Sequence, residues 1–168
     1  MFKNQNRFKL KIAVATVCLL QFVGGSFAST TTSTFATQVT LVASCTINSA
    51  STLNFGSQGV LIANVDQTST LQVQCTNTTP YNIGLDAGTG TGATVAVRKM
   101  TSGANTVNYS LYSDSGRSTV WGNTVGTNTV AATGSGASQS YTVYGRVTAQ
   151  TTPAPATYSD TVTVTVTY

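Results

Sequence analysis

The chain has 168 residues, of which 40% are hydrophobic and 7% charged, with no His and a formal charge of +4. This length suits one domain with its own core rather than two, and the aliphatic content is too high for a disordered chain. The whole positive excess lies in Lys3, Arg7, Lys9 and Lys11, because four Asp residues balance the other four cations. The neutral remainder has no basic patch and predicts no nucleic-acid partner.

The first element in chain order is a secretory signal peptide. A basic start is followed by an apolar run from Ile12 to Val23 and by small residues that end at Ala28, which is the layout of a cleaved signal. The run is too short for a transmembrane helix, which needs about 20 apolar residues. We predict cleavage after Ala28, export to an oxidising compartment, and a mature chain without a transmembrane segment.

Cys45 and Cys75 are the two cysteines of the expected mature chain. In an oxidising compartment such a pair is typical of a disulfide, which by closing a loop of about 30 residues would stabilise the fold by about 3.5 kcal/mol. Two buried free thiols are the alternative. Two Cys without His cannot complete a tetrahedral zinc site, so neither a metal ion nor a cofactor is expected.

The mature chain is predicted to consist of strands, and no segment of it predicts a helix. Branched aliphatic and aromatic residues recur at every second position, which is the pattern of half-buried strands. The alternating runs cover residues 35–41, 70–75, 81–85, 95–97, 107–111, 141–147 and 161–168, with turns at 88–92, 114–116 and 134–136. Gly116 is expected to supply a positive φ in its turn. This spacing predicts an all-β sandwich.

Both ends of the expected mature chain alternate and lack the Lys, Arg or Glu that usually protects an exposed strand edge. Residues 161–168 form one such end, and a Ser/Thr run at 29–34 leads into the other. The two end strands could pair with other chains, or they could pair within one domain. The sequence pattern leaves both alternatives open.

The composition argues against an enzyme. General acid–base catalysis mostly uses His or paired carboxylates, and this chain has no His, no Glu and four scattered Asp residues. We interpret Arg98 and Lys99 as a solvated strand edge, and no catalytic residue is expected. Trp121 is expected in a core or an interface, although with Tyr112 it could form a sugar-binding patch. A self-contained secreted module that binds a glycan or protein is therefore the alternative to a structural protein.

Several segments together resemble the spore coat protein U domain family, which includes pilin subunits of archaic chaperone–usher pili. Their order and spacing span essentially the whole mature chain. They are Cys45-Thr46 after an alternating segment, Leu53-Asn54-Phe55-Gly56, Tyr109 to Asp114 followed by Arg117 and Trp121, and the closing run 158–168. The resemblance implies an incomplete immunoglobulin-like β-sandwich that lacks its last strand and is completed by donor-strand exchange.

The resemblance also implies the partners of such a domain. A periplasmic pilus chaperone would lend a strand during export, and an outer-membrane usher would assemble the fibre. In the fibre, the N-terminal segment of the next subunit would occupy the groove, which gives a head-to-tail polymer at the cell surface. Adhesion and biofilm formation are the expected roles, and a single domain fits a shaft or adaptor subunit better than a two-domain tip adhesin.

The resemblance divides the chain into a signal peptide (1–28), a donor segment (29–43) and a sandwich domain (44–168). It implies that the disulfide of Cys45 and Cys75 joins the first two strands. The expected donor side chains, which share one face of an extended strand, are Phe35, Thr37, Val39 and Leu41. The residues expected to border the acceptor groove are Val162, Val164 and Val166.

Overall fold

The computed structural model describes residues 25–168, so residues 1–24 of the predicted signal peptide lie outside the described part of the chain. The chain divides into two units, Met1–Val39 and Thr40–Tyr168. Residues 25–44 contain no helix or strand, so the strand predicted over 35–41 is not formed. Within residues 25–168 we find no helix long and apolar enough to cross a membrane.

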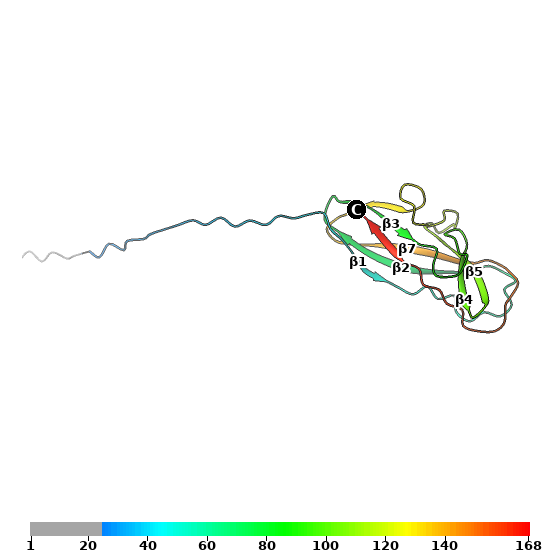
Figure 1. Ribbon diagram of the computed structural model, residues 1–168. Helices are drawn as coiled ribbons and strands as arrows, with labels where there is room; N and C mark the ends of the chain where they lie inside the picture. Colours follow the sequence, from blue (N-terminus) through cyan, green and yellow to red (C-terminus); the bar gives the residue numbers. More distant parts are fainter. Residues whose placement is uncertain (1–24) are drawn as a thin grey trace, which may run out of the picture. The chain divides into compact units, whose positions relative to one another are not determined.

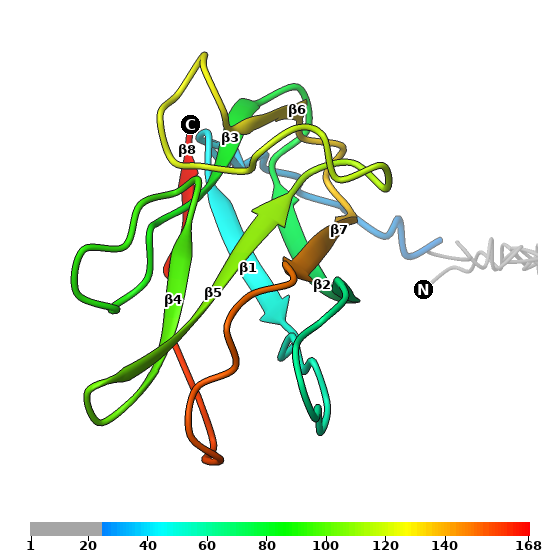
Figure 2. The same ribbon diagram turned by 90° about the vertical axis from the view of Figure 1, so that its right-hand side faces the viewer.

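The second unit is a sandwich of two antiparallel sheets, and the predicted all-β class is confirmed (Figures 1 and 2). One sheet has the order β1-β2-β7-β5-β4 and the other the order β6-β3-β8. The strands are β1 (Cys45–Ala50), β2 (Val65–Cys75), β3 (Pro80–Leu85), β4 (Arg98–Ser102), β5 (Asn105–Tyr112), β6 (Val130–Thr133), β7 (Ser138–Val147) and β8 (Val164–Thr167).

Five predicted runs coincide with β2, β3, β5, β7 and β8, and the remaining differences have local causes. The run at 95–97 is a loop, closed by a hydrogen bond from the Thr94 N–H to the Val97 carbonyl (2.9 Å), and β4 begins only at Arg98. The alternation pattern did not reveal β1 and β6, which are short and carry few large apolar residues, although the family resemblance implied a strand at Cys45. These two strands depend on pairing with β2 and β3 rather than on their own alternation.

The core lies between the sheets and consists of the inward residues of each alternating strand. Trp121, on the loop after β5, is almost completely buried in it, and its indole Nε1–H donates to the carbonyl of Ile83 (2.8 Å). The expected packing role of Trp121 therefore holds, and its proposed use in a sugar-binding patch is wrong. Burial of a large side chain of this kind contributes about 1.5–3 kcal/mol.

Cys45 and Cys75 form the predicted disulfide, which excludes the alternative of two free thiols. They are directly opposite each other in the register of β1 and β2, with a Cα–Cα distance of 4.1 Å. The bridge thus fixes β1, an edge strand of the five-stranded sheet, to its neighbour.

The interpretation of Arg98 as part of a solvated edge is wrong, because its side chain is 0% exposed. Its guanidinium donates four hydrogen bonds to main-chain carbonyls. The acceptors are Asp86 (2.7 Å), Val95 (2.8 Å), Leu85 (3.0 Å) and Trp121 (2.8 Å). Arg98 thereby joins the end of β3 to the loop that crosses to the other sheet, and each of its three buried nitrogen atoms has an acceptor, as buried polar groups require.

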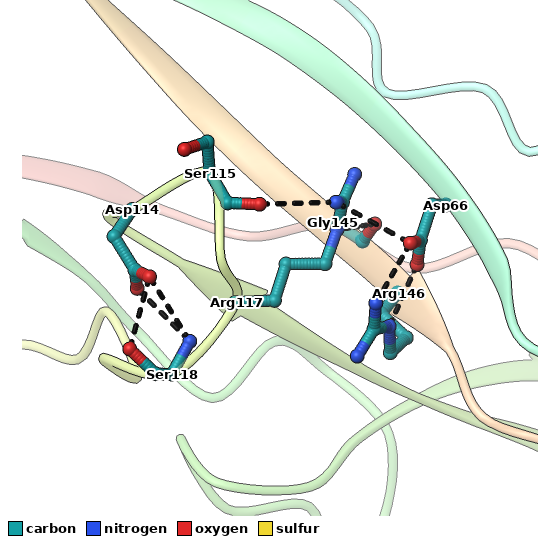
Figure 3. Close-up of polar contacts among 7 residues, drawn as sticks. All are labelled: Asp66, Asp114, Ser115, Arg117, Ser118, Gly145 and Arg146. Atoms are coloured by element: carbon teal, nitrogen blue, oxygen red, sulfur yellow. Dashed lines mark hydrogen bonds and ion pairs between the residues drawn. The ribbon is translucent and has the colours of Figure 1, made fainter.

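The turn after β5 also differs from the sequence prediction. Arg117, not Gly116, adopts the positive φ, at 54°. The carboxylate of Asp114 accepts hydrogen bonds from the N–H groups of Ser118 (3.0 Å) and Thr119 (2.6 Å). The Asp114 side chain therefore fixes the conformation of the turn. This arrangement directs Arg117 across the five-stranded sheet toward Asp66 (Figure 3).

Candidate functional site

The candidate site lies beside β8, whose second edge has no strand partner within residues 25–168. An immunoglobulin-type sandwich places strands A, B, E and D in one sheet and C, F and G in the other. Here β1, β2, β7 and β5 occupy the first set of positions, and β3 and β8 occupy the positions of C and F. The position of G, next to β8, is empty.

A groove opens in this region, between residues 50–55 after β1 and residues 158–164 before and in β8. Its volume is about 550 Å³. The floor is made of core side chains from both sheets, namely Leu71, Leu85, Tyr109, Leu111 and Val143. The groove therefore opens directly into the apolar interior.

A second hollow of about 730 Å³ adjoins the groove. It runs between residues 53–61 and 152–158, and it shares Leu53, Phe55, Met100 and Tyr158 with the groove. Together the two hollows make an apolar trough along one side of the sandwich.

The segment Leu53 to Gly56 supported the family resemblance, and its first three residues line both hollows. The side-chain carbonyl of Asn54 accepts a hydrogen bond from the Gly56 N–H (2.8 Å), and Gly56 has a φ of 74°. Leu53 and Phe55 pack on Gly145 of β7, where a Cβ would lie 3.0 Å from the Phe55 ring and still closer to Leu53. The absence of a side chain at Gly145 thus lets this segment approach the sheet.

Val162, Val164 and Val166 point half-buried side chains toward the core, and the first two line the groove. Thr163 is bonded toward β3, because the Asp86 N–H donates to its carbonyl (3.1 Å). Main-chain groups alternate in direction along a strand, so those of the three valines point to the unpaired edge. The Val162 main chain forms no hydrogen bond within residues 25–168.

Two carboxylates hold the stretch before β8. The Asp86 carboxylate accepts the N–H groups of Thr163 and Gly88 (both 2.9 Å). Burial raises the pKa of Asp86, but these N–H donors and the nearby Arg98 outweigh burial and bring the pKa below its ordinary value.

The Asp160 carboxylate has four hydrogen-bond donors around it. One oxygen accepts the Thr89 N–H (2.8 Å), the Thr89 hydroxyl (2.9 Å) and the Thr161 N–H (2.8 Å), and the other accepts the Tyr109 hydroxyl (2.7 Å). Burial, followed by this hydrogen bond, raises the pKa of Tyr109 far above its ordinary value. The sequence analysis missed both carboxylates. The sequence did hold one indication of their role. Residues 29–168 contain only eight charged side chains, so each of their four Asp residues is a candidate for a specific contact.

The predicted donor residues lie in the stretch without strands. Phe35, Val39 and Leu41 are 88%, 80% and 84% exposed, and Thr37 is exposed as well.

The outer face of the five-stranded sheet carries a separate polar cluster (Figure 3). Asp66 is paired with both Arg146 (2.7 Å) and Arg117 (3.3 Å), and Arg117 also lies over the Tyr144 ring. The hydrogen bond from Arg146, with help from the charge of Arg117, lowers the pKa of Asp66 despite partial burial. These charges satisfy one another, and no group of three or more His, Cys, Asp or Glu in residues 25–168 could hold a metal ion.

Comparison with known proteins places these features in a family. The family model described as Spore Coat Protein U domain matches residues 31–165. "Protein U" of Myxococcus xanthus is 36% identical over 179 aligned positions, which cover 97% of this chain and 99% of that protein.

Among solved structures, the chain is similar to the crystal structure of the CsuC–CsuE chaperone–tip adhesion subunit pre-assembly complex from the archaic chaperone–usher Csu pili of Acinetobacter baumannii. The TM-score is 0.56 and the sequence identity 26%, with 77% of this chain covered. The chain spans 40% of the length of the matched chain.

Proposed function

The chain belongs to the Spore Coat Protein U domain family, and we propose that it is a structural subunit, not an enzyme, of a surface pilus assembled by the chaperone–usher pathway. The observation that carries the proposal is the apolar groove beside the unpaired edge of β8, at the place where the last strand of an immunoglobulin-type sandwich would lie. Core side chains line this groove, so a free domain would be incomplete.

The chemistry of the groove fits an added β-strand. The main-chain groups of Val162, Val164 and Val166 supply a pairing edge, and the apolar floor accepts alternate side chains of the incoming strand. Residues 29–43 of a neighbouring subunit match this requirement, because Phe35 and Val39 lie on one face of an extended strand and are exposed. Burial of each such side chain contributes about 1.5–3 kcal/mol.

The arrangement of donor and groove also determines the form of the assembly. A segment that fills the groove of the next copy makes a head-to-tail contact, and such contacts build an open fibre when the rotation does not close. The similar Acinetobacter structure is a chaperone–subunit complex, which supports a periplasmic chaperone as a partner of this chain. An outer-membrane usher, a place in the fibre at the cell surface, and a role in adhesion and biofilm formation complete the proposal.

The proposal is tested in the bacterium that produces the chain, where the proposed chaperone and usher are present, by analysing its surface extracts on SDS gels without boiling. We expect ladders of SDS-resistant oligomers that collapse to monomer on boiling. Val39→Asp should abolish the ladder, because a carboxylate cannot enter the apolar groove without a large desolvation cost. Ile62→Asp is the matched control, since Ile62 is 83% exposed on a loop of the sandwich; it should leave the ladder intact. Monomer alone from the unaltered chain would overturn the proposal.

A further inference from the structure

We propose that Asp160 is a positioning residue of the groove, which holds the wall formed by residues 158–163 where an incoming strand can pair with it. This inference rests on the proposed function of the groove as an acceptor of a β-strand. It adds that the wall is held open by a fixed polar network before any strand arrives.

The wall needs such support because it has little pairing of its own. The regular strand β8 begins only at Val164, and before it the wall is bridged to β4 at a single residue pair, Thr101 and Ser159. The side facing the groove is unpaired at Val162. A peptide segment paired so sparsely opens at low free energy unless other contacts hold it.

Asp160 supplies these contacts from the centre of the wall. Its carboxylate reaches Thr89 on the loop after β3 and Tyr109 on β5, so it joins the wall to both sheets at once. Tyr109 is buried in the groove floor and packs edge-to-face with Phe55, with ring centroids 6.2 Å apart. The hydrogen bond from Tyr109 to Asp160 therefore connects the floor of the groove with its wall.

A second contact replaces a missing sheet hydrogen bond next to Asp160. In an antiparallel ladder the Thr163 N–H would donate to the Asp86 carbonyl, but here that carbonyl accepts from Arg98 Nε (2.7 Å). The Asp86 carboxylate accepts the Thr163 N–H in its place (2.9 Å). The wall is thus held by two carboxylates where the regular ladder ends.

The shape of the loop after β3 shows that it is fitted to Asp160. Gly88 has a φ of 77°, and a Cβ on it would lie 2.7 Å from the Asp160 carboxyl carbon and closer still to one carboxyl oxygen. The carboxylate thus occupies the space that any side chain at this position would need. The close contact of Gly88 with the Asp160 carboxylate therefore fixes the loop against the wall before a strand binds.

Preorganisation has a measurable consequence for binding. If only a fraction of molecules holds the wall in place, the apparent affinity for an incoming strand falls by that same fraction. A contact that merely stabilises the sandwich would change the unfolding midpoint without changing the rate at which a strand enters the groove.

The experiment measures how fast a fluorescent peptide of residues 29–43 enters the groove of the whole exported chain. The chain is unfolded in guanidinium and refolded by dilution to a low concentration, and excess peptide is added only after the Trp121 fluorescence shows that refolding is complete. Binding is then followed by fluorescence anisotropy. Gly88→Ala displaces the Asp160 carboxylate. Gly126→Ala is its control, because Gly126 has the same φ of 77° but no atom lies within 4 Å of the position that an added Cβ would take. Tyr109→Phe removes one hydrogen bond to Asp160, and Tyr81→Phe is its control, because Tyr81 is a buried tyrosine bonded to Tyr141.

We expect Gly88→Ala and Tyr109→Phe to bind the peptide at least tenfold more slowly than their respective controls. Equal association rates within each pair, with normal binding by the unaltered chain, would overturn the role of Asp160 and leave the proposed function in place. Failure of the unaltered chain to bind the peptide at all would overturn the proposed function and this inference with it.

Discussion

Replacement of Arg98 by Met tests whether the buried guanidinium holds the sandwich together. Met keeps the unbranched apolar stem of the side chain but donates no hydrogen bond, so four main-chain carbonyls of the interior lose their partner. Each hydrogen bond to a charged donor contributes about 1.5–3 kcal/mol, and the cost of burying the charge offsets several kcal/mol of that total. We expect Arg98→Met to lower the free energy of unfolding by about 3–5 kcal/mol, as when one member of a buried charged network is removed.

The loss can be followed through Trp121, the only tryptophan of the chain. Its carbonyl accepts one of the Arg98 hydrogen bonds and its indole is buried, so its fluorescence reports the region directly during urea unfolding. Arg98→Lys keeps a positive charge but cannot reach four separated carbonyls from one nitrogen atom, and it should recover only part of the loss. Arg146→Met is the control, because Arg146 forms its ion pair with Asp66 on the outer face of the sheet, where both side chains are partly exposed, and a surface ion pair contributes about 1 kcal/mol or less.

A free energy of unfolding for Arg98→Met within about 1 kcal/mol of the unaltered chain would refute the reasoning. That result would mean that water or neighbouring groups satisfy the four carbonyls as well as the guanidinium does. A loss as large for Arg146→Met as for Arg98→Met would refute it too, since burial would then make no difference.

Two further outcomes follow from the disulfide and from the carboxylates. Cys45→Ser should lower the free energy of unfolding by about 3.5 kcal/mol, because the bridge closes a loop with a sequence separation of 30, and urea unfolding that matches the unaltered chain would contradict this. The folded-state pKa values of Asp66 and Asp86 lie below their ordinary value. The ionised carboxylates therefore stabilise the fold fully above the unfolded pKa of about 3.9, and this stabilisation is lost as the pH falls through the folded pKa. The melting temperature should therefore fall below about pH 4, and Asp86→Asn should reduce that fall; an unchanged fall would rule out Asp86 as its source.

The strands with strong alternation were predictable, because a period of two places the same side chains on the core face whatever the neighbours are. Such prediction succeeded for β2, β3, β5 and β7. It failed for β1 and β6, whose residues form strands only because a stronger strand pairs with them. It also placed the start of the last strand too early, because the Thr163 N–H bonds the Asp86 carboxylate rather than the main chain and the ladder ends at Val164.

The position of Arg98 could not be inferred from its neighbours in the sequence. Arg is almost always exposed unless it is paired, so a solvated edge was the reasonable expectation. The four carbonyls around it converge only in the folded chain, where the connection from β3 to β4 crosses from one sheet to the other. The acceptors are also main-chain groups, which leave no sign in the identity of the residues that carry them.

Several of the few charged residues of this chain hold the structure around the groove. Hydrophobic contacts are non-directional, so an apolar groove without a strand in it would tend to close on itself and bury its own floor. Hydrogen-bonded networks fix distances and angles. Asp160 lines the groove, Arg98 bonds the carbonyl of Leu85, which also lines it, and Asp86 bonds Thr163 beside it. Under the proposed function, a sandwich that receives its last strand from another chain needs directional contacts at that edge. Three of the eight charged residues in 29–168 supply such contacts here.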